Sequence, residues 1–206
     1  MKKLWTDLHS NIHHNQMDEL DKWTEHAKDV LDFWPIAYYP FQMIKTESGA
    51  GLEDLCPEEE IKKDWEIVRR KVKEENANGY PMFMGYEWQG CGFDGDHNVF
   101  FLDNEQDMKH PMRYQELRDD YKDTEAIGIP HHVAYQLGSR GKNWATHDEN
   151  FSPFAEIYSS HGCSENDTGG MDMERHLHMG PRTGETCYER GLEAGLHVGC
   201  MAPGDN

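Results

Sequence analysis

The chain has 206 residues, with 39 acidic and 20 basic side chains and 13 histidines, so its formal net charge is −19. This length is enough for one domain of ordinary size. The acidity excludes a simple nucleic-acid binder, because phosphate contacts require Lys and Arg. Only 36% of the residues are hydrophobic, but 11% are aromatic, which argues against disorder.

Cysteine usage and the first residues predict a cytoplasmic protein that binds no membrane. The five cysteines are odd in number and form no C-x-x-C pair, which favours free thiols over disulfides. No apolar run approaches the roughly 20 residues needed to cross a membrane, and the amino terminus does not resemble a signal peptide. Many histidines in an acidic chain indicate metal, provided that they occupy positions that metal chemistry requires.

The first half of the chain alternates between predicted strands and helices. Strands are expected over residues 3–8 and 32–40, on either side of a helix over residues 18–31 with an apolar face at three-to-four spacing. Residues 41–56 contain a Gly-rich centre and are expected to form a loop. A second helix is predicted over residues 57–78, because a proline and three glutamates open it.

The second half continues this alternation. Residues 80–88 and 98–102 are expected to form a hairpin, since Asp94-Gly95 between them is a turn signal. The later predictions are helices over 112–122 and 185–194, and strands over 126–133, 154–159 and 197–201. Strands that alternate with helices predict an α/β fold with a largely parallel sheet, either open or closed into a barrel. Residues 1–206 are expected to form a single domain.

Polar residues gather at or just after the ends of the predicted strands: His9, Glu87, His131, His132, His161 and Asp205. Ligands of α/β folds bind where strands end, so these side chains should converge. Neutral imidazole and carboxylate suit Zn, Mn and Fe. Bound metal lowers the pKa of coordinated water, and two ions can clamp a phosphoryl group. The sequence therefore predicts metal-assisted hydrolysis of a small, anionic substrate.

Five segments resemble, in order, the landmarks of the PHP (polymerase and histidinol phosphatase) superfamily, and most closely a bacterial branch of it. They are Asp7-Leu8-His9, Gly85-Tyr86-Glu87-Trp88, Ile129-Pro130-His131-His132, Glu156-Ile157-Tyr158-Ser159-Ser160-His161-Gly162 and Gly204-Asp205-Asn206. The resemblance implies a distorted (β/α)7 TIM-like barrel, incomplete at its carboxyl end. It also implies one to three divalent ions at the barrel mouth and hydrolysis of a phosphoester by a metal-bound hydroxide.

The resemblance implies five metal ligands, namely His9, Glu87, His131, His161 and Asp205. His9 matches the first His of the family's H-x-H motif, and Glu87 matches the glutamate that commonly bridges two ions. Asp205 matches the aspartate of the terminal D-x-H motif. His132 is the alternative to His131, and either one could act as acid or base.

Three departures from the family pattern leave alternatives open. The second His of H-x-H is Asn11, the His expected after the second strand is Tyr39, and the chain ends at Asn206, one residue before the last expected His. The further candidate ligands are Asn11, His13, His14, His97 and His132. A reduced site would hold one or two ions. The alternative functions are a catalytically degenerate binding or structural domain and an amidohydrolase-like hydrolase of C–N or C–O bonds.

Other residues are expected to support the site. Asp7 should orient a metal-bound histidine rather than bind metal. Neighbours on a strand point to opposite faces, so only one of His131 and His132 should face the site, and His131 is favoured. Tyr39 and Arg140 are candidates for binding substrate, although a buried aromatic and a solvated turn are the simpler interpretations. The low apolar content leaves a homo-oligomer open.

Overall fold

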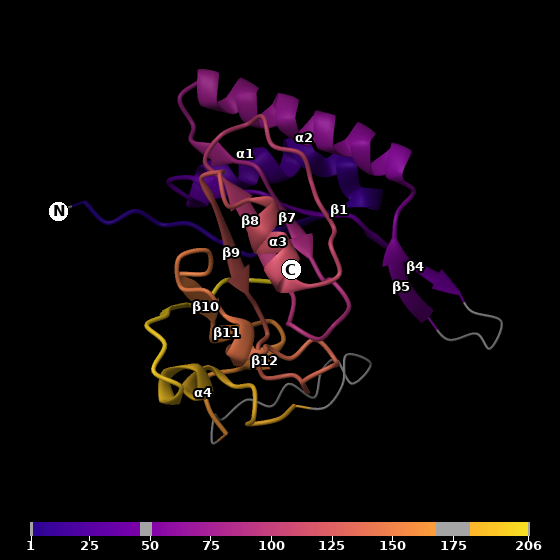
Figure 1. The fold of residues 1–206 in the computed structure, drawn as a ribbon. Helices are drawn as coiled ribbons and strands as arrows, with labels where there is room; N and C mark the ends of the chain where they lie inside the picture. The colour runs from indigo at the N-terminus through magenta and orange to yellow at the C-terminus, as the bar shows by residue number, and fades with distance from the viewer. Residues whose placement is uncertain (1, 46–50, 168–181, 206) are drawn as a thin grey trace.

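The computed structural model of the chain describes residues 2–45, 51–167 and 182–205. Figure 1 shows two long helices above a sheet, with the carboxyl-terminal segments below it. The helices are α1 (Leu20–Val30), α2 (Glu58–Ala77), α3 (Tyr114–Asp120) and α4 (Tyr188–Glu193). Short 3-10 helices span His14–Glu19 and Trp144–Thr146.

The main sheet has five strands in the order β1-β3-β7-β8-β9. These strands are β1 (Asn11–His13), β3 (Ala37–Tyr39), β7 (Gly85–Trp88), β8 (His97–Phe101) and β9 (Ala126–Pro130). β1, β3 and β7 run parallel, whereas β8 is antiparallel to both β7 and β9. Because β8 reverses direction, its first residues lie at the same edge as the last residues of β7 and β9.

The other strands form four two-stranded sheets. β2 (Trp34–Pro35) pairs in parallel with β6 (Met82–Phe83), and β10 (Phe154–Glu156) pairs in parallel with β13 (Gly199–Met201). β4 (Phe41–Lys45) is antiparallel to β5 (Gly51–Leu55), and β11 (Tyr158–Ser159) is antiparallel to β12 (Gly162–Cys163). In Figure 1 the β4–β5 hairpin projects from the body of the protein.

The main core lies between the helices and one face of the sheet. Trp65, Val68 and Val72 of α2 recur at helical spacing and pack in one cluster with Val99 and Phe101 of β8. Their apolar side chains are nearly inaccessible, and burying each one contributes about 1.5–3 kcal/mol relative to exposure. This burial holds α2 on the sheet and leaves the strand ends free for polar residues.

The predicted (β/α)7 barrel is wrong. In the described residues the main sheet is open, because its edge strands β1 and β9 do not pair with each other. β10 and β13 belong to a separate sheet, and the four α-helices of residues 2–45, 51–167 and 182–205 are too few to follow each of seven strands. The physical reason is the hairpin of β7 and β8, whose short connection reverses the chain where a barrel needs a helical crossover to a parallel strand.

Some of the helices and strands predicted from the sequence are confirmed, and others are wrong. The helix expected over residues 57–78 and the hairpin of 80–88 with 98–102 are observed as α2 and β7–β8. The strand expected over residues 3–8 is not formed, and the first strand begins at Asn11. The loop expected over residues 41–56 is wrong in part, because residues 41–45 and 51–55 pair as the antiparallel strands β4 and β5; residues 46–50 lie outside the described residues.

Candidate metal centre

The structure gathers the predicted ligands in one buried cluster. His9, Glu87 and His131 are 0%, 3% and 1% exposed, and His161 and Asp205 are buried as well. The imidazole rings follow one another: the ring centroids of His9 and His131 are 4.1 Å apart, and those of His132 and His161 are 4.6 Å apart. Side chains from distant parts of the sequence therefore share one site.

Two sets of three side chains bring ligand atoms within 4.8 Å of one another. One set is His9, Glu87 and His131, and the other is His9, Glu156 and Asp205. Both sets contain only imidazole and carboxylate, which bind Zn, Mn and Fe. Because His9 belongs to both sets, its orientation determines how the site can hold a cation.

Glu156 orients His9. The Nδ1 atom of His9 lies 2.6 Å from Oε2 of Glu156, a hydrogen bond between buried groups. The Nε2 atom then faces the cluster, 3.2 Å from Oδ1 of Asp205 and 3.8 Å from Oε2 of Glu87. A carboxylate that holds the distal nitrogen of a histidine is the usual support of a metal-ligating imidazole.

His131 is the most direct test of whether a cation fits. Both of its ring nitrogens are buried and lack a hydrogen-bond partner in the described part of the chain. An unsatisfied buried polar atom costs about 1–3 kcal/mol, so two on one ring are unfavourable without a ligand. A metal ion in contact with His9 and Glu87 would satisfy one of these nitrogens, and the residues present therefore fit a metal.

His132 also faces the cluster, contrary to the expected alternation. Its ring centroid is 4.3 Å from that of His131, and its φ is +35°. β9 ends at Pro130, so neither histidine is part of a regular strand. The left-handed backbone at His132 turns its side chain to the same side as that of His131, and alternation does not apply.

The carboxylates of the cluster generate a strongly negative field. Burial, together with the charges of Glu156 and Glu87, raises the pKa of Asp205 to about 7 against the attraction of His9. Burial lowers the pKa of His9, but the negative charges of Asp205 and Glu156 outweigh this effect. The pKa of His9 is therefore well above its usual value. Burial raises the pKa of Glu87, but its contacts with His9 and Gln89 leave it below the usual range. A field that draws positive charge onto a buried imidazole also favours a divalent cation.

The two histidines after β9 remain neutral in this field. Burial and the neighbouring imidazoles His9 and His132 hold the pKa of His131 well below its usual value. Burial and His161 have the same effect on the pKa of His132. Neutral imidazole is the form that binds metal, so no proton has to leave these rings before a cation enters.

The other candidate ligands have different partners. Nδ2 of Asn11 donates to Oε2 of Glu87 at 3.1 Å. His14 lies 2.6 Å from Asp64 and 3.1 Å from Glu60, both on α2. His97 is buried and contacts the carbonyl of Gly95 and the ammonium of Lys142, so both its ring nitrogens are engaged. The half-buried ring of His13 packs on Tyr39, with centroids 4.4 Å apart.

Asp7 contacts backbone rather than an imidazole. Its Oδ1 accepts from the N–H of His9 at 2.8 Å, and its Oδ2 accepts from the N–H of Gly204 at 3.0 Å. The orienting role predicted for Asp7 is therefore filled by Glu156. By joining the backbones of residues 9 and 204, Asp7 holds His9 and the Asp205 segment together.

Sequence reasoning missed two buried carboxylates of the cluster, Glu156 and Asp96. Glu156 is the last residue of β10, and a carboxylate at a strand end was the available signal. Asp96 directly precedes β8 and reaches the site because β8 is antiparallel. Its Oδ2 lies 3.7 Å from Nε2 of His132, and burial raises its pKa to about 8, with Arg140 acting in the opposite direction.

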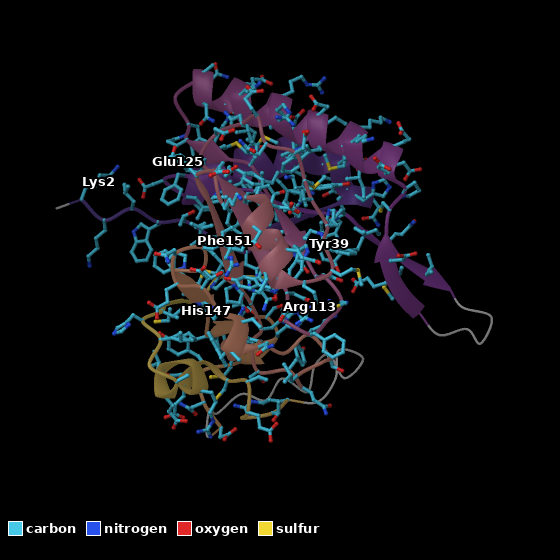
Figure 2. All side chains as sticks on the ribbon, viewed as in Figure 1. Lys2, Tyr39, Arg113, Glu125, His147 and Phe151 are labelled. Atoms are coloured by element: carbon cyan, nitrogen blue, oxygen red, sulfur yellow. The ribbon has the colours of Figure 1, made fainter. Side chains whose placement is uncertain are left out.

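The predicted substrate-binding residues lie beside the cluster. Nη1 of Arg140 donates to Oδ2 of Asp96 at 3.1 Å, and its Nη2 contacts Glu53 on β5. The hydroxyl of Tyr39, at the end of β3, also contacts Glu53 and accepts a hydrogen bond from Gln89 at 3.0 Å. Figure 2 shows Tyr39 and Arg113 on the side of the protein from which the β4–β5 hairpin projects.

Comparison with known proteins gives little further information. No protein-family model matches the sequence, and no curated protein matches it. A solved structure from Bacteroides vulgatus, described as a two-domain protein containing a predicted PHP-like metal-dependent phosphoesterase, is similar with a TM-score of 0.46 and 14% identity. The similarity covers 78% of this chain and 46% of that one, so this chain spans less than half the length of that protein.

One finding bears on membranes. Within residues 2–45, 51–167 and 182–205, no helix combines the length and apolar character needed to span a bilayer.

Proposed function

We propose that the protein is a metal-dependent hydrolase of small anionic molecules, with phosphoesters as the substrate class. One observation carries this proposal: a buried set of His9, Glu87 and His131 in which both ring nitrogens of His131 lack a partner among the described residues. A structural cluster of the same size would pair these nitrogens, because unpaired buried polar atoms are unfavourable. The resemblance of five ordered segments to the PHP superfamily supports the choice of phosphoesters.

Each residue has a separate part in the proposed reaction. His9, Glu87, His131 and Asp205 would hold one or two ions of Mn, Zn or Fe, and His161 borders them, 3.2 Å from Asp205. When bound, such ions polarise a phosphoryl oxygen and lower the pKa of water. Glu156 keeps the Nε2 atom of His9 directed at the site.

His132 is the candidate for proton transfer. His131 belongs to a potential ligand set, so His132 is the histidine after β9 that remains available as acid or base. Its ring borders both His131 and His161 and is neutral, since burial and neighbouring imidazoles lower its pKa. Its Nε2 atom lies at the edge of the cluster, 3.7 Å from Oδ2 of Asp96, in a position to accept a proton from a reacting group.

The test is the metal content of protein purified without chelator, measured for Mn, Fe and Zn together. We expect stoichiometric metal in the wild type and loss of most of it in His9→Ala and Glu87→Ala. His197→Ala is the matched control, because His197 has a 90% exposed side chain and lies outside the cluster. Phosphoester hydrolysis should follow metal content across these variants. Absence of metal from the wild type, or equal metal in His9→Ala and His197→Ala, would refute the proposal.

A further inference from the structure

We propose that Arg140 and Tyr39 form a subsite for an anionic group of the substrate, and that Glu53 occupies this subsite as a competitor within the chain. The inference rests on the proposed hydrolase function and specifies how substrate enters. It predicts that the part of the β4–β5 hairpin that carries Glu53 must move away from Arg140 and Tyr39 before an anion can bind beside the metal centre.

The two oxygens of one carboxylate are bound from two directions. The Tyr39 hydroxyl contacts Oε1 of Glu53, and Nη2 of Arg140 contacts Oε2 of Glu53. Burial and the charges of Glu87 and Glu53 raise the pKa of Tyr39, so its hydroxyl stays protonated and donates. A guanidinium and a phenol hydroxyl directed at two oxygens of one group are the donors that recognise a carboxylate or a phosphate.

The subsite adjoins the metal cluster on two sides. Nε2 of Gln89 bridges the Tyr39 hydroxyl and Oε1 of Glu87, at 3.0 and 3.1 Å. On the other side, Asp96 accepts from Arg140 at 3.1 Å and faces His132 at 3.7 Å. An anion held by Tyr39 and Arg140 would therefore lie one side chain away from Glu87. The substrate class is a molecule with a carboxylate or phosphate in addition to the group that reacts at the metal.

The element that carries Glu53 is suited to move. β4 and β5 pair only with each other in the described sheets, and each has five residues. A two-stranded hairpin is marginally stable by itself, so contacts such as those of Glu53 hold it against the body. The side chain of Glu53 is 23% exposed, so water and solutes already reach it.

Arg140 is held in place independently of Glu53. Asp96 binds its Nη1 atom, and its backbone N–H donates to the carbonyl of Gly92 at 3.2 Å. Its φ of +70° lies in the left-handed region, which non-glycine residues rarely adopt and which is costly to keep. If Glu53 moves away, Nη2 of Arg140 loses its acceptor while Nη1 stays bound to Asp96. An incoming anion would then take the place of Glu53 at Nη2.

The experiment measures binding of inorganic phosphate and of acetate to the protein as purified, by titration calorimetry. Glu53→Gln removes the competing charge and keeps the side-chain size, so the better-fitting anion should bind about tenfold tighter, because it no longer displaces a charge-assisted hydrogen bond. Asp54→Asn is the matched control, because Asp54 is the neighbour of Glu53 on β5 and its Oδ1 accepts a hydrogen bond from the N–H of Leu55. Arg140→Lys should weaken binding about tenfold and abolish the gain from Glu53→Gln.

Hydrogen exchange of residues 41–45 and 51–55 gives a second measurement. Saturating anion should speed exchange in the wild type but not in Arg140→Lys. The subsite would be overturned if wild type and Glu53→Gln bound both anions with equal affinity. It would also be overturned if the gain in affinity from Glu53→Gln persisted in the variant that carries both Glu53→Gln and Arg140→Lys. Metal content of the same preparations separates the two proposals. If the protein is metal-free but Glu53→Gln binds anion more tightly in an Arg140-dependent way, the hydrolase is refuted and the subsite is supported. If the protein holds metal but Glu53→Gln gives no such gain in affinity, the subsite is refuted and the hydrolase is supported.

Discussion

Lys142 is a buried lysine whose charge state should control the pH dependence of stability. The residue is 1% exposed, and its ammonium nitrogen lies 3.0 Å from Nε2 of His97 and 4.1 Å from the centre of the Tyr114 ring. His97 donates from Nδ1 to a backbone carbonyl, so its Nε2 atom accepts a hydrogen bond from Lys142. Burial lowers the pKa of Lys142 to about 7, with only Asp94 acting against it.

The sign of the effect follows from the two states of Lys142. Between pH 7 and its ordinary pKa of 10.5, the unfolded chain binds a proton that the folded protein does not. Stability from this group is therefore complete above pH 10.5 and is lost as the pH falls toward 7. Lys142→Met removes this contribution. The difference in unfolding free energy between wild type and Lys142→Met should rise by about 1.4 kcal/mol per pH unit between pH 8 and 9.

Urea denaturation at pH 8.0, 8.5 and 9.0 measures this difference, and comparing two proteins cancels the other titrating groups. Lys62→Met is the control. The contact with Glu58 raises the pKa of Lys62, so that ammonium is charged in both states over this range and the difference should be flat. A flat difference for Lys142→Met as well would show that Lys142 is charged in the folded protein, and the reasoning would fail.

Four other outcomes are expected. Glu156→Gln should lower metal affinity about 10–100-fold in equilibrium dialysis by releasing the His9 ring, and unchanged affinity would contradict the orienting role. Gly141→Ala should cost about 3 kcal/mol in denaturant unfolding, because a Cβ there would lie 1.8 Å from the carbonyl oxygen of Tyr135. Gly195→Ala, with φ +86° but open space, should cost only about 1 kcal/mol, so equal losses would reject the steric argument. A chelator should lower the melting temperature of wild type but not of His9→Ala.

Short-range patterns in the sequence were sufficient for several elements. The helical spacing of Trp65, Val68 and Val72 predicts α2, because a buried stripe at that period requires a helix. Asp94-Gly95 predicts the reversal between β7 and β8, because the residue types themselves favour a turn. The barrel prediction was wrong at the same segment, because a reversal there places an antiparallel strand where a barrel needs a parallel one.

The convergence of Glu87 and His131 followed from one general rule, that strand ends converge at one edge of a sheet, whereas His9 joins them from the segment before β1. That rule concerns position and holds without knowing distances. The rule that adjacent strand residues point to opposite faces misplaced His132. β9 ends two residues before His132, and the φ of His132 is positive, so the rule does not apply there. Local backbone geometry, which residue types alone do not determine, decided that both histidines face the site.

By itself the sequence determined which chemistry the protein could carry: imidazoles and carboxylates at the ends of strands, in an acidic chain with a modest core. Only the tertiary structure decided which groups act together. Glu156 binds a histidine 147 positions away, and Glu53 faces an arginine 87 positions away. Such pairings depend on how separate elements pack, because a hydrogen bond requires contact within about 3 Å and no local pattern records which distant carboxylate comes that close.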